Sequence, residues 1–265
     1  KIINLYLKET MDHYNPLFYQ VYVGLLKFKY LWNKLIGHKN EITVTGDFYN
    51  MLGVISSYNT IYMAKSKNIN DYIYYFYGIN KCILPVPRFF VSSDSLETWF
   101  EEYIIRKTGG FIIHKSKLNN LLYYECIMGY LSILASHGVP VLYFPELHES
   151  ESSMLVSQSS DKFFNMLNNV MFNETTEIVL IPSEITYKNR LDESLTKDVF
   201  TEPVGINFSA PVFLSEYTKQ SNMEISISEL INKIWLMDEI ILPHYIICGI
   251  LIDNMYIIKA AKLKK

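Results

Sequence analysis

The chain has 265 residues, enough for one large domain with a full hydrophobic core. With 49% hydrophobic and 19% charged residues, its composition is that of a globular protein rather than of a disordered or collagen-like chain. The net charge of −3 is carried without a long run of basic residues. This excludes an extended nucleic-acid-binding surface, and we expect no nucleic-acid partner.

Cysteine and histidine positions give no metal-binding pattern. The six histidines never stand in ligand-like pairs, so we expect no metal ion. The three cysteines are far apart in the chain, which favours reduced, buried thiols of an intracellular protein. They are Cys82, Cys126 and Cys248.

No stretch of the sequence is a good membrane span. The longest apolar run, Ile240–Ile252, is shorter than the ~20 residues that a spanning helix needs, and it contains Pro243. We therefore expect a core or interfacial helix there. The chain begins at Lys1 rather than Met, which leaves open a targeting or membrane segment before it.

The first third of the chain is predicted to be mostly helical. Residues 4–36 carry tyrosines and leucines at helical spacing, interrupted at Pro16, and predict one or two helices. Two interpretations stay open for them: an arm packed on the main domain, or a segment at a membrane interface. Thr45 is expected to cap a helix that ends at Ser56, and a short buried strand follows at 59–63.

The rest of the chain alternates between helices and strands, with one long polar loop at Lys188–Thr201. The expected helices cover Asp71–Ile79, closed near Gly78, Leu96–Lys107, Leu118–Ser136, Ser157–Met171 and Ile225–Met237. The expected strands cover Arg88–Ser92, Phe111–Ile113, Val139–Phe144, Glu177–Ile181, which Pro182 should end, and Gly205–Phe208.

This alternation predicts an α/β fold with a mainly parallel central sheet flanked by helices, and with helical additions at both ends. We divide the chain into an N-terminal helical region at 1–58, an α/β domain at 59–220 and a C-terminal helical region at 221–265. Common chemical signatures are absent. The sequence has no GxGxxG, no GxxxxGK[ST], no HExxH, no CxxC and no GxSxG.

Four segments nevertheless resemble, in order and spacing, the glycerol-3-phosphate and dihydroxyacetone-phosphate acyltransferases. They are GGFII at 109–113, YFPE at 143–146, LIPSEITY at 180–187 and VGINFSAPVFLSEY at 204–217. The resemblance covers about residues 25–251. It implies transfer of an acyl chain from a coenzyme A or acyl-carrier-protein thioester onto the hydroxyl of a phosphorylated three-carbon alcohol, with no other cofactor and at a membrane surface.

The first motif of this family is His-x4-Asp, in which the histidine is the general base and the aspartate orients it. The matching segment here is KSKNINDY, which places Asp71 at the aspartate and Ser66 at the histidine. A serine hydroxyl is a poor proton acceptor near neutral pH, and losing a general base typically costs about 10² to 10⁴-fold in rate. Without a histidine to orient, Asp71 is also a plausible carboxylate at a helix N-terminus.

The second family motif pairs two glycines with basic residues that hold phosphate. Gly109 and Gly110 match the glycines, and His114 and Lys115 stand where the family has arginines. Lys115 can attract an anion as a point charge but lacks the bidentate fork of arginine. A solvated lysine at a strand end explains it equally well.

The third family motif is Glu-Gly followed by arginines, one of which pairs with the glycerol phosphate. Here Glu146 is kept, the glycine becomes Leu147, and Glu149 and Glu151 replace the arginines in a surface loop. Charge of the wrong sign about 4 Å from a phosphate costs several kcal/mol of binding at an effective dielectric near 20. The fourth motif keeps Pro182, which in the family lies by the acyl and substrate cleft.

We therefore interpret the sequence as a glycerol-3-phosphate acyltransferase-like protein of glycerophospholipid biosynthesis whose acyl transfer is weak or lost, a pseudoenzyme. It would be intracellular and membrane-associated, and it would keep a role in binding acyl groups, a membrane surface or a protein partner. A competing interpretation is a divergent but active acyltransferase with His114 or His148 as the base. An unrelated α/β interaction domain is a third.

Overall fold

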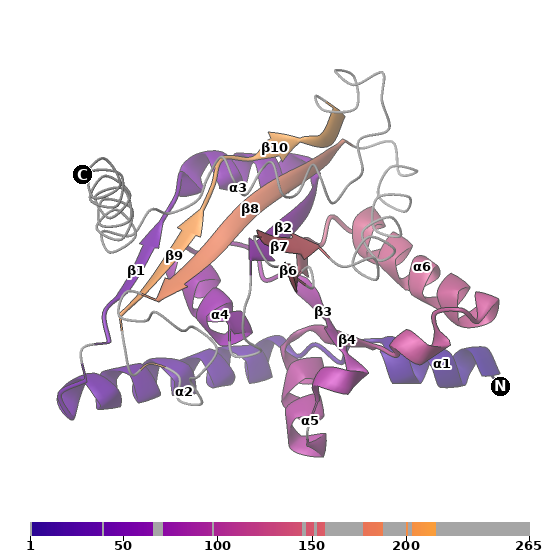
Figure 1. Cartoon of the computed structure of the whole chain (residues 1–265), viewed down its shortest axis with the longest axis horizontal. Coiled ribbons are helices and arrows are strands. Elements are labelled where there is room, and N and C mark those ends of the chain that lie inside the picture. Colours follow the sequence, from indigo (N-terminus) through magenta and orange to yellow (C-terminus); the bar gives the residue numbers. More distant parts are fainter. Residues whose placement is uncertain are drawn as a thin grey trace, which may run out of the picture.

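The computed structural model describes residues 2–38, 40–65, 71–96, 98–144, 147–150, 153–156, 177–187, 200 and 203–215. In this part of the chain an eight-stranded sheet has the order β1-β9-β8-β2-β5-β3-β4, with β10 beside β8 (Figure 1). Its strands are β1 (Ile42–Thr45), β2 (Asn59–Lys65), β3 (Arg88–Ser92), β4 (Gly110–Ile113), β5 (Val141–Tyr143), β8 (Ile178–Tyr187), β9 (Val204–Phe208) and β10 (Val212–Phe213).

Six α-helices surround this sheet among the described residues. They are α1 (Ile2–Thr10), α2 (Pro16–Leu35), α3 (Phe48–Ser57), α4 (Asp71–Lys81), α5 (Trp99–Thr108) and α6 (Leu121–Ser136), with short 3-10 turns at Ser93–Ser95 and Lys115–Lys117. Five neighbouring strands, β8, β2, β5, β3 and β4, are mutually parallel. β9 runs antiparallel to β8, and β1 pairs in parallel with β9. The expected α/β fold with a mainly parallel sheet flanked by helices is confirmed.

Alternation along each strand supplies two apolar faces to the sheet. In β2, Tyr62 and Ala64 belong to a core with α2, α3 and α4, whereas Ile61 and Met63 belong to a second core with α6. Tyr6 and Met11 from the N-terminus pack against this second core. A sheet covered on both faces buries continuous apolar strands, which explains why β4 and β5 are wholly buried.

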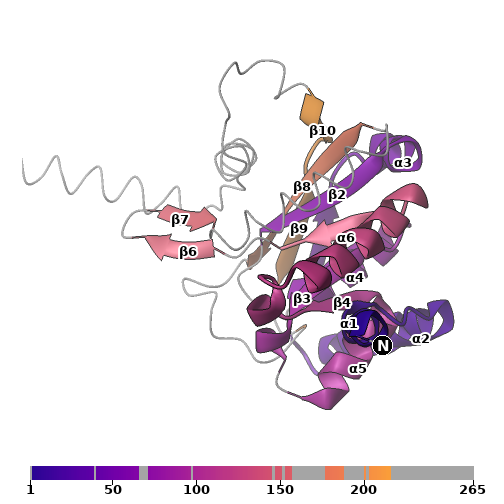
Figure 2. The ribbon, with the colours of Figure 1, turned by 90° about the vertical axis from the view of Figure 1, so that its right-hand side faces the viewer.

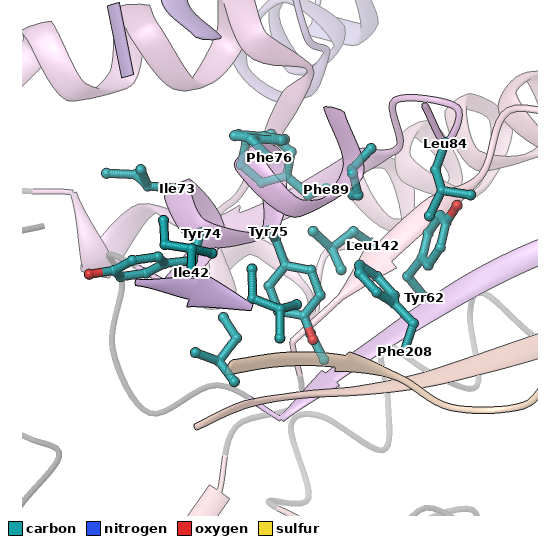
Figure 3. Packing of buried hydrophobic residues seen from close by; sticks show 14 of the residues in the cluster. Ile42, Tyr62, Ile73, Tyr74, Tyr75, Phe76, Leu84, Phe89, Leu142 and Phe208 are labelled. Atoms are coloured by element: carbon teal, nitrogen blue, oxygen red, sulfur yellow. The ribbon is translucent and has the colours of Figure 1, made fainter. Parts of the chain in front are cut away.

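Aromatic side chains dominate the core beneath α4 (Figure 3). Phe76 packs edge to face on Phe89 of β3, with ring centroids 5.1 Å apart. Tyr75 packs in the same way on Phe208 of β9 at 5.9 Å. Gly78 lies inside α4, which continues to Lys81. A Cβ at this position would meet the Ile206 side chain at 3.0 Å. The expectation that the helix closes near this glycine is therefore wrong, and close packing on β9 explains the residue.

The cap of α3 also differs from the sequence-based expectation. Asp47 is the N-cap, and its carboxylate accepts a hydrogen bond from the Asn50 N–H. Thr45 instead ends β1, and its hydroxyl donates to the Asn207 side-chain oxygen at 2.8 Å. An aspartate two residues later outcompetes Thr45 as a cap because the threonine is held by pairing with β9.

Pro182 lies inside β8, opposite Met63 of β2, and does not end the strand as expected. Its carbonyl accepts from the Ser209 N–H at 2.8 Å, so this side of the proline faces the break between β9, which ends at Phe208, and β10, which begins at Val212. The missing proline N–H points to the same side and costs no ladder hydrogen bond there.

The segment after β5 forms a separate antiparallel hairpin of β6 (Leu147–Ser150) and β7 (Ser153–Val156), which stands off the main sheet (Figure 2). The surface loop expected around Glu149 is therefore a strand. The helices expected at 157–171 and 225–237, and the loop expected at 188–201 apart from Phe200, lie outside the described residues.

Two arginines fasten the N-terminal arm to the domain. The Arg88 Nε donates to the Asp12 carboxylate at 2.7 Å, and its guanidinium lies 3.9 Å from the centroid of the Tyr14 ring. Arg106 donates to the Met11 carbonyl at 2.7 Å. Burial and the neighbouring Asp12 charge raise the pKa of the Tyr130 phenol, which donates to the same carboxylate at 2.7 Å. This arm packs against the domain, as one of the two open interpretations required.

The helices of the described ranges include none with the length and apolar character needed to cross a bilayer.

Candidate functional site

Asp71, the aspartate of the first motif, begins α4 directly after the segment that leaves β2. Only 1% of its surface is exposed. Its carboxylate accepts a hydrogen bond from the phenol of Tyr187, the last residue of β8. The first and fourth matched segments therefore meet at the carboxyl ends of two adjacent parallel strands, the edge at which α/β proteins place their sites.

A second polar chain lies one helical turn further into α4. The Tyr75 phenol donates to the Ser183 hydroxyl at 2.6 Å, and Ser183 donates to the Met63 carbonyl at 3.1 Å. Burial raises the pKa of Tyr75 well above its usual value; the Ser183 hydrogen bond opposes this, and the nearby charges of Asp71 and Glu184 add to it. Tyr75 is therefore a neutral donor at every physiological pH.

The spacing of these residues explains why they meet. Asp71 and Tyr75 are four apart and share one face of α4, while Ser183 and Tyr187 are four apart and share one face of β8. Sequence reasoning identified only Asp71; it missed its partner Tyr187 and the neighbouring pair Tyr75 and Ser183. The available signal was one serine within the buried strand 178–187 and a tyrosine at its end.

This arrangement limits the chemistry that Asp71 can perform. The Tyr187 phenol is the donor in its hydrogen bond to the Asp71 carboxylate, so it is not placed to accept a proton from a substrate. The carboxylate itself is buried, so an alcohol substrate must first displace the packing around it. The described geometry joins α4 to β8. Ser66, at the histidine position, lies outside the described residues.

The two glycines of the second motif lie at the opposite, amino-terminal edge of the sheet. Gly109 ends α5 in a left-handed conformation with φ of 106°, which only glycine adopts without strain. Gly110 begins β4, and a Cβ there would lie 2.3 Å from the Ile105 side chain. Both glycines are explained by the helix-to-strand turn, and neither is brought near Asp71.

His114 and Lys115 follow β4 at the carboxyl edge but at the far side of the sheet. The His114 N–H donates to the Tyr123 phenol at 2.9 Å. Lys115 begins a 3-10 turn. Four strand spacings separate β4 from β8, which carries Tyr187, a span of roughly 19 Å. The sheet order therefore does not bring the His114 imidazole to the Asp71 carboxylate.

The arginines of the described residues stand at no matched phosphate-binding position, and of the glutamates of the third motif only Glu149 is described. Arg88 begins β3 and Arg106 lies in the last turn of α5, and both bind the N-terminal arm at the amino edge. Glu149 lies in β6 opposite Met154. Glu146 and Glu151 lie outside the described residues. In the described ranges, no group of three or more His, Cys, Asp and Glu side chains could hold a metal ion.

Comparison with known proteins gives distant but consistent matches. No family model matches the sequence. Glycerol-3-phosphate acyltransferase of Alteromonas mediterranea is 22% identical over 212 residues, covering 76% of this chain and 23% of that protein. The Haemophilus influenzae protein of the same name is 23% identical over 214 residues, covering 72% and 26%. These similarities support a relation to the acyltransferase family.

The chain spans about a quarter of the length of the curated relatives it matches. The protein of the same name from Shewanella sp. is 23% identical over 192 residues, which is 71% of this chain and 22% of that protein. A solved structure, the 1-acyl-sn-glycerophosphate acyltransferase PlsC of Thermotoga maritima, is 14% identical with a TM-score of 0.48, covering 82% of this chain and 76% of that one.

Proposed function

We propose that this chain is a glycerol-3-phosphate acyltransferase-like protein of glycerophospholipid biosynthesis whose own acyl transfer is weak or lost. The proposal is supported chiefly by the first motif, which lacks its histidine and has its aspartate buried. Its aspartate, Asp71, is buried and bound by the Tyr187 phenol, and serine stands at the histidine position. Sequence similarity to glycerol-3-phosphate acyltransferases supplies the substrate class.

The weakened site has two physical parts. Without an imidazole at Ser66, proton removal from the acceptor hydroxyl loses a factor of about 10² to 10⁴. Without arginines at the third motif, where the sequence has Glu149 and Glu151, a phosphate dianion meets negative charge instead of a bidentate donor. The two losses act on different steps, catalysis and binding, and so reinforce each other.

The test offers the purified chain an acyl-coenzyme A, or an acyl-carrier-protein thioester, together with glycerol 3-phosphate or dihydroxyacetone phosphate. We expect turnover at least about 10²-fold below that of an ordinary glycerol-3-phosphate acyltransferase assayed in parallel. Comparable turnover would refute the proposal and favour the divergent active enzyme. In that event His114→Ala and His148→Ala identify the relocated base, since only its removal abolishes transfer.

We propose that the chain still binds acyl groups. A fold that keeps an acyltransferase core can bind an acyl thioester without transferring the chain, and a titration of acyl-coenzyme A measures this separately from turnover. We place this activity at a membrane surface, with peripheral association, and we include a protein partner that supplies the missing catalytic groups as part of the same proposal.

A further inference from the structure

Helix α2 has an apolar surface on both of its faces. Its inner face, with Tyr19, Val23 and Leu26, is buried against the domain. Its outer face exposes a continuous series of large apolar side chains. They are Leu17, Val21, Leu25, Phe28, Leu31, Trp32, Leu35 and, just after the helix, Ile36, each with more than half of its surface accessible.

These exposed residues share one side of the helix. Leu17, Val21, Phe28 and Leu35 are spaced by one or two helical turns, so they line up opposite the buried face. Leu17 is 74% exposed and Leu35 is 82% exposed. The rings of Phe28 and Trp32 stack on each other within this series, with centroids 6.2 Å apart. A run of this size on a soluble surface marks an interaction site.

Charge on α2 is arranged on both sides of the apolar series. Helical periodicity places Lys27 and Lys34 along one flank and Lys29 along the other, all three exposed. The helix contains no aspartate or glutamate. Apolar and aromatic residues flanked by lysines are the pattern of a helix that lies in a bilayer surface, with the lysine stems buried and their ammonium groups at the lipid phosphates.

The apolar surface continues beyond α2. Phe18 packs edge to face on Tyr103 of α5 at 5.8 Å, and α5 exposes Trp99 and Phe100 beside it. α1, α2 and α5 gather at one end of the molecule (Figures 1 and 2). The acidic residues of α5 are engaged within their own helix. Glu101 accepts from the Thr98 N–H, and Glu102 pairs with Arg106.

We propose that the outer face of α2, with Phe28 and Trp32 at its middle, binds the surface of an anionic phospholipid bilayer. This rests on the membrane association included in the proposed function and names the surface that performs it. A second copy of the chain fits this face less well. Pairing two α2 helices brings lysines together with no carboxylate from either helix to neutralise them.

The test measures co-sedimentation of the full chain with vesicles of phosphatidylcholine and phosphatidylglycerol in a ratio of about 3:1, and with phosphatidylcholine alone. The chain should pellet with the anionic vesicles. The variant Val21→Glu/Phe28→Glu should bind them at least about tenfold more weakly, because two apolar groups no longer enter the interface. The matched control is Leu121→Glu/Ile133→Glu, which adds the same charge at exposed positions of α6 and should bind normally.

A second readout follows Trp32 itself. In the variant Trp99→Phe/Trp235→Phe, Trp32 is the only tryptophan, and its emission should shift to shorter wavelength when anionic vesicles are added. The variant Lys27→Gln/Lys29→Gln/Lys34→Gln should lose the preference for phosphatidylglycerol. The positions changed in α2, α5 and α6 are exposed, and circular dichroism checks that each variant is folded.

The outcomes separate this surface from the proposed function. If the Val21→Glu/Phe28→Glu variant binds vesicles as tightly as the unchanged chain, the α2 face is not the membrane-binding surface. Peripheral association through another face would then remain. If the unchanged chain does not bind vesicles but forms a dimer, and the variant is monomeric, the face binds a second copy of the chain. That result also overturns the proposal. Acyl transfer is assayed in detergent without vesicles, so its presence or absence bears on the proposed function alone.

Discussion

The two ends of the parallel strands treat their polar residues differently. At the amino ends, Arg88 and Asp12 form a partly exposed ion pair that holds the N-terminal arm, with 16% and 13% of their side chains accessible. At the carboxyl ends, the Asp71 carboxylate and the Tyr75 phenol are buried in hydrogen bonds to β8. In the described residues, the polar groups at the carboxyl edge are joined by internal hydrogen bonds, whereas those at the amino edge lie close to solvent. The comparison teaches that one sheet uses the polar groups at its two edges in different ways, to join α4 to β8 at one edge and to hold the N-terminal arm at the other.

The largest expected effect is at Asp71. Replacing it by leucine leaves the Tyr187 phenol buried without its acceptor, and we expect the free energy of unfolding to fall by about 2–4 kcal/mol. Urea denaturation measures this. Adding Tyr187→Phe should recover part of the loss, because both polar groups are then gone.

The control for this experiment is Asp94→Asn, at an exposed position, which should change stability by less than about 0.5 kcal/mol. If Asp71 were instead a strained catalytic residue, Asp71→Leu would leave stability unchanged or raise it. That result would break the comparison between the two edges.

The next effect concerns Gly110 at the amino edge. In Gly110→Ala the new methyl group meets the Ile105 side chain, so α5 or β4 must shift, and we expect a loss of about 1–3 kcal/mol in unfolding free energy. Gly129→Ala, in α6 with open space around it, should stabilise the helix by about 0.5–1 kcal/mol. Equal stability of the two variants would show that Gly110 is not kept for packing.

A smaller effect is expected for the ion pair. Arg88→Met removes both the bond to Asp12 and the stacking on Tyr14, and should lower stability by about 1–2 kcal/mol. Limited proteolysis should cut the N-terminal arm faster in this variant, whereas Lys107→Met, at the neighbouring helix end, should leave the rate unchanged. A cleavage rate unaffected by Arg88→Met would mean that apolar packing alone holds the arm.

The smallest effect is expected for Ser66→His. This change restores the histidine of the first motif, but Asp71 remains bound to Tyr187 and the acidic third motif remains unchanged. Acyl transfer should therefore stay at the level of the unchanged chain in the thioester assay. A rise of about tenfold or more would show that the lost base alone limits the reaction.

Much of the fold followed from the sequence because apolar periodicity is a local signal. The strand at Arg88–Ser92 was predicted with its observed bounds, and the helix expected at 118–136 ends at Ser136 as predicted. Pro182 was misread, because its place beside the break between β9 and β10 depends on strands that are distant in sequence. The local sequence around a proline does not tell whether the side of its strand that lacks an N–H faces a paired strand or a gap in the sheet.

The candidate site was predictable only in part, for a similar reason. A motif comparison found Asp71, but its partner Tyr187 is 116 positions away and becomes a neighbour only through the parallel pairing of β2 and β8. The glycines matched to the second motif stand at the start of β4, which is the edge opposite Asp71. Strand direction, which no short motif encodes, decides which motif residues can share a site.

The pairing of β1 with β9 ties the order of synthesis to the integrity of the sheet. Ile42 lies opposite Val204, so β1 leaves the ribosome well before β9, the strand whose backbone pairs with it. Until then β1 and the β9 side of β8 are open edges that can pair with another nascent chain. Truncated products that stop before residue 204 should therefore aggregate, which makes this stretch the boundary that any expression fragment must include.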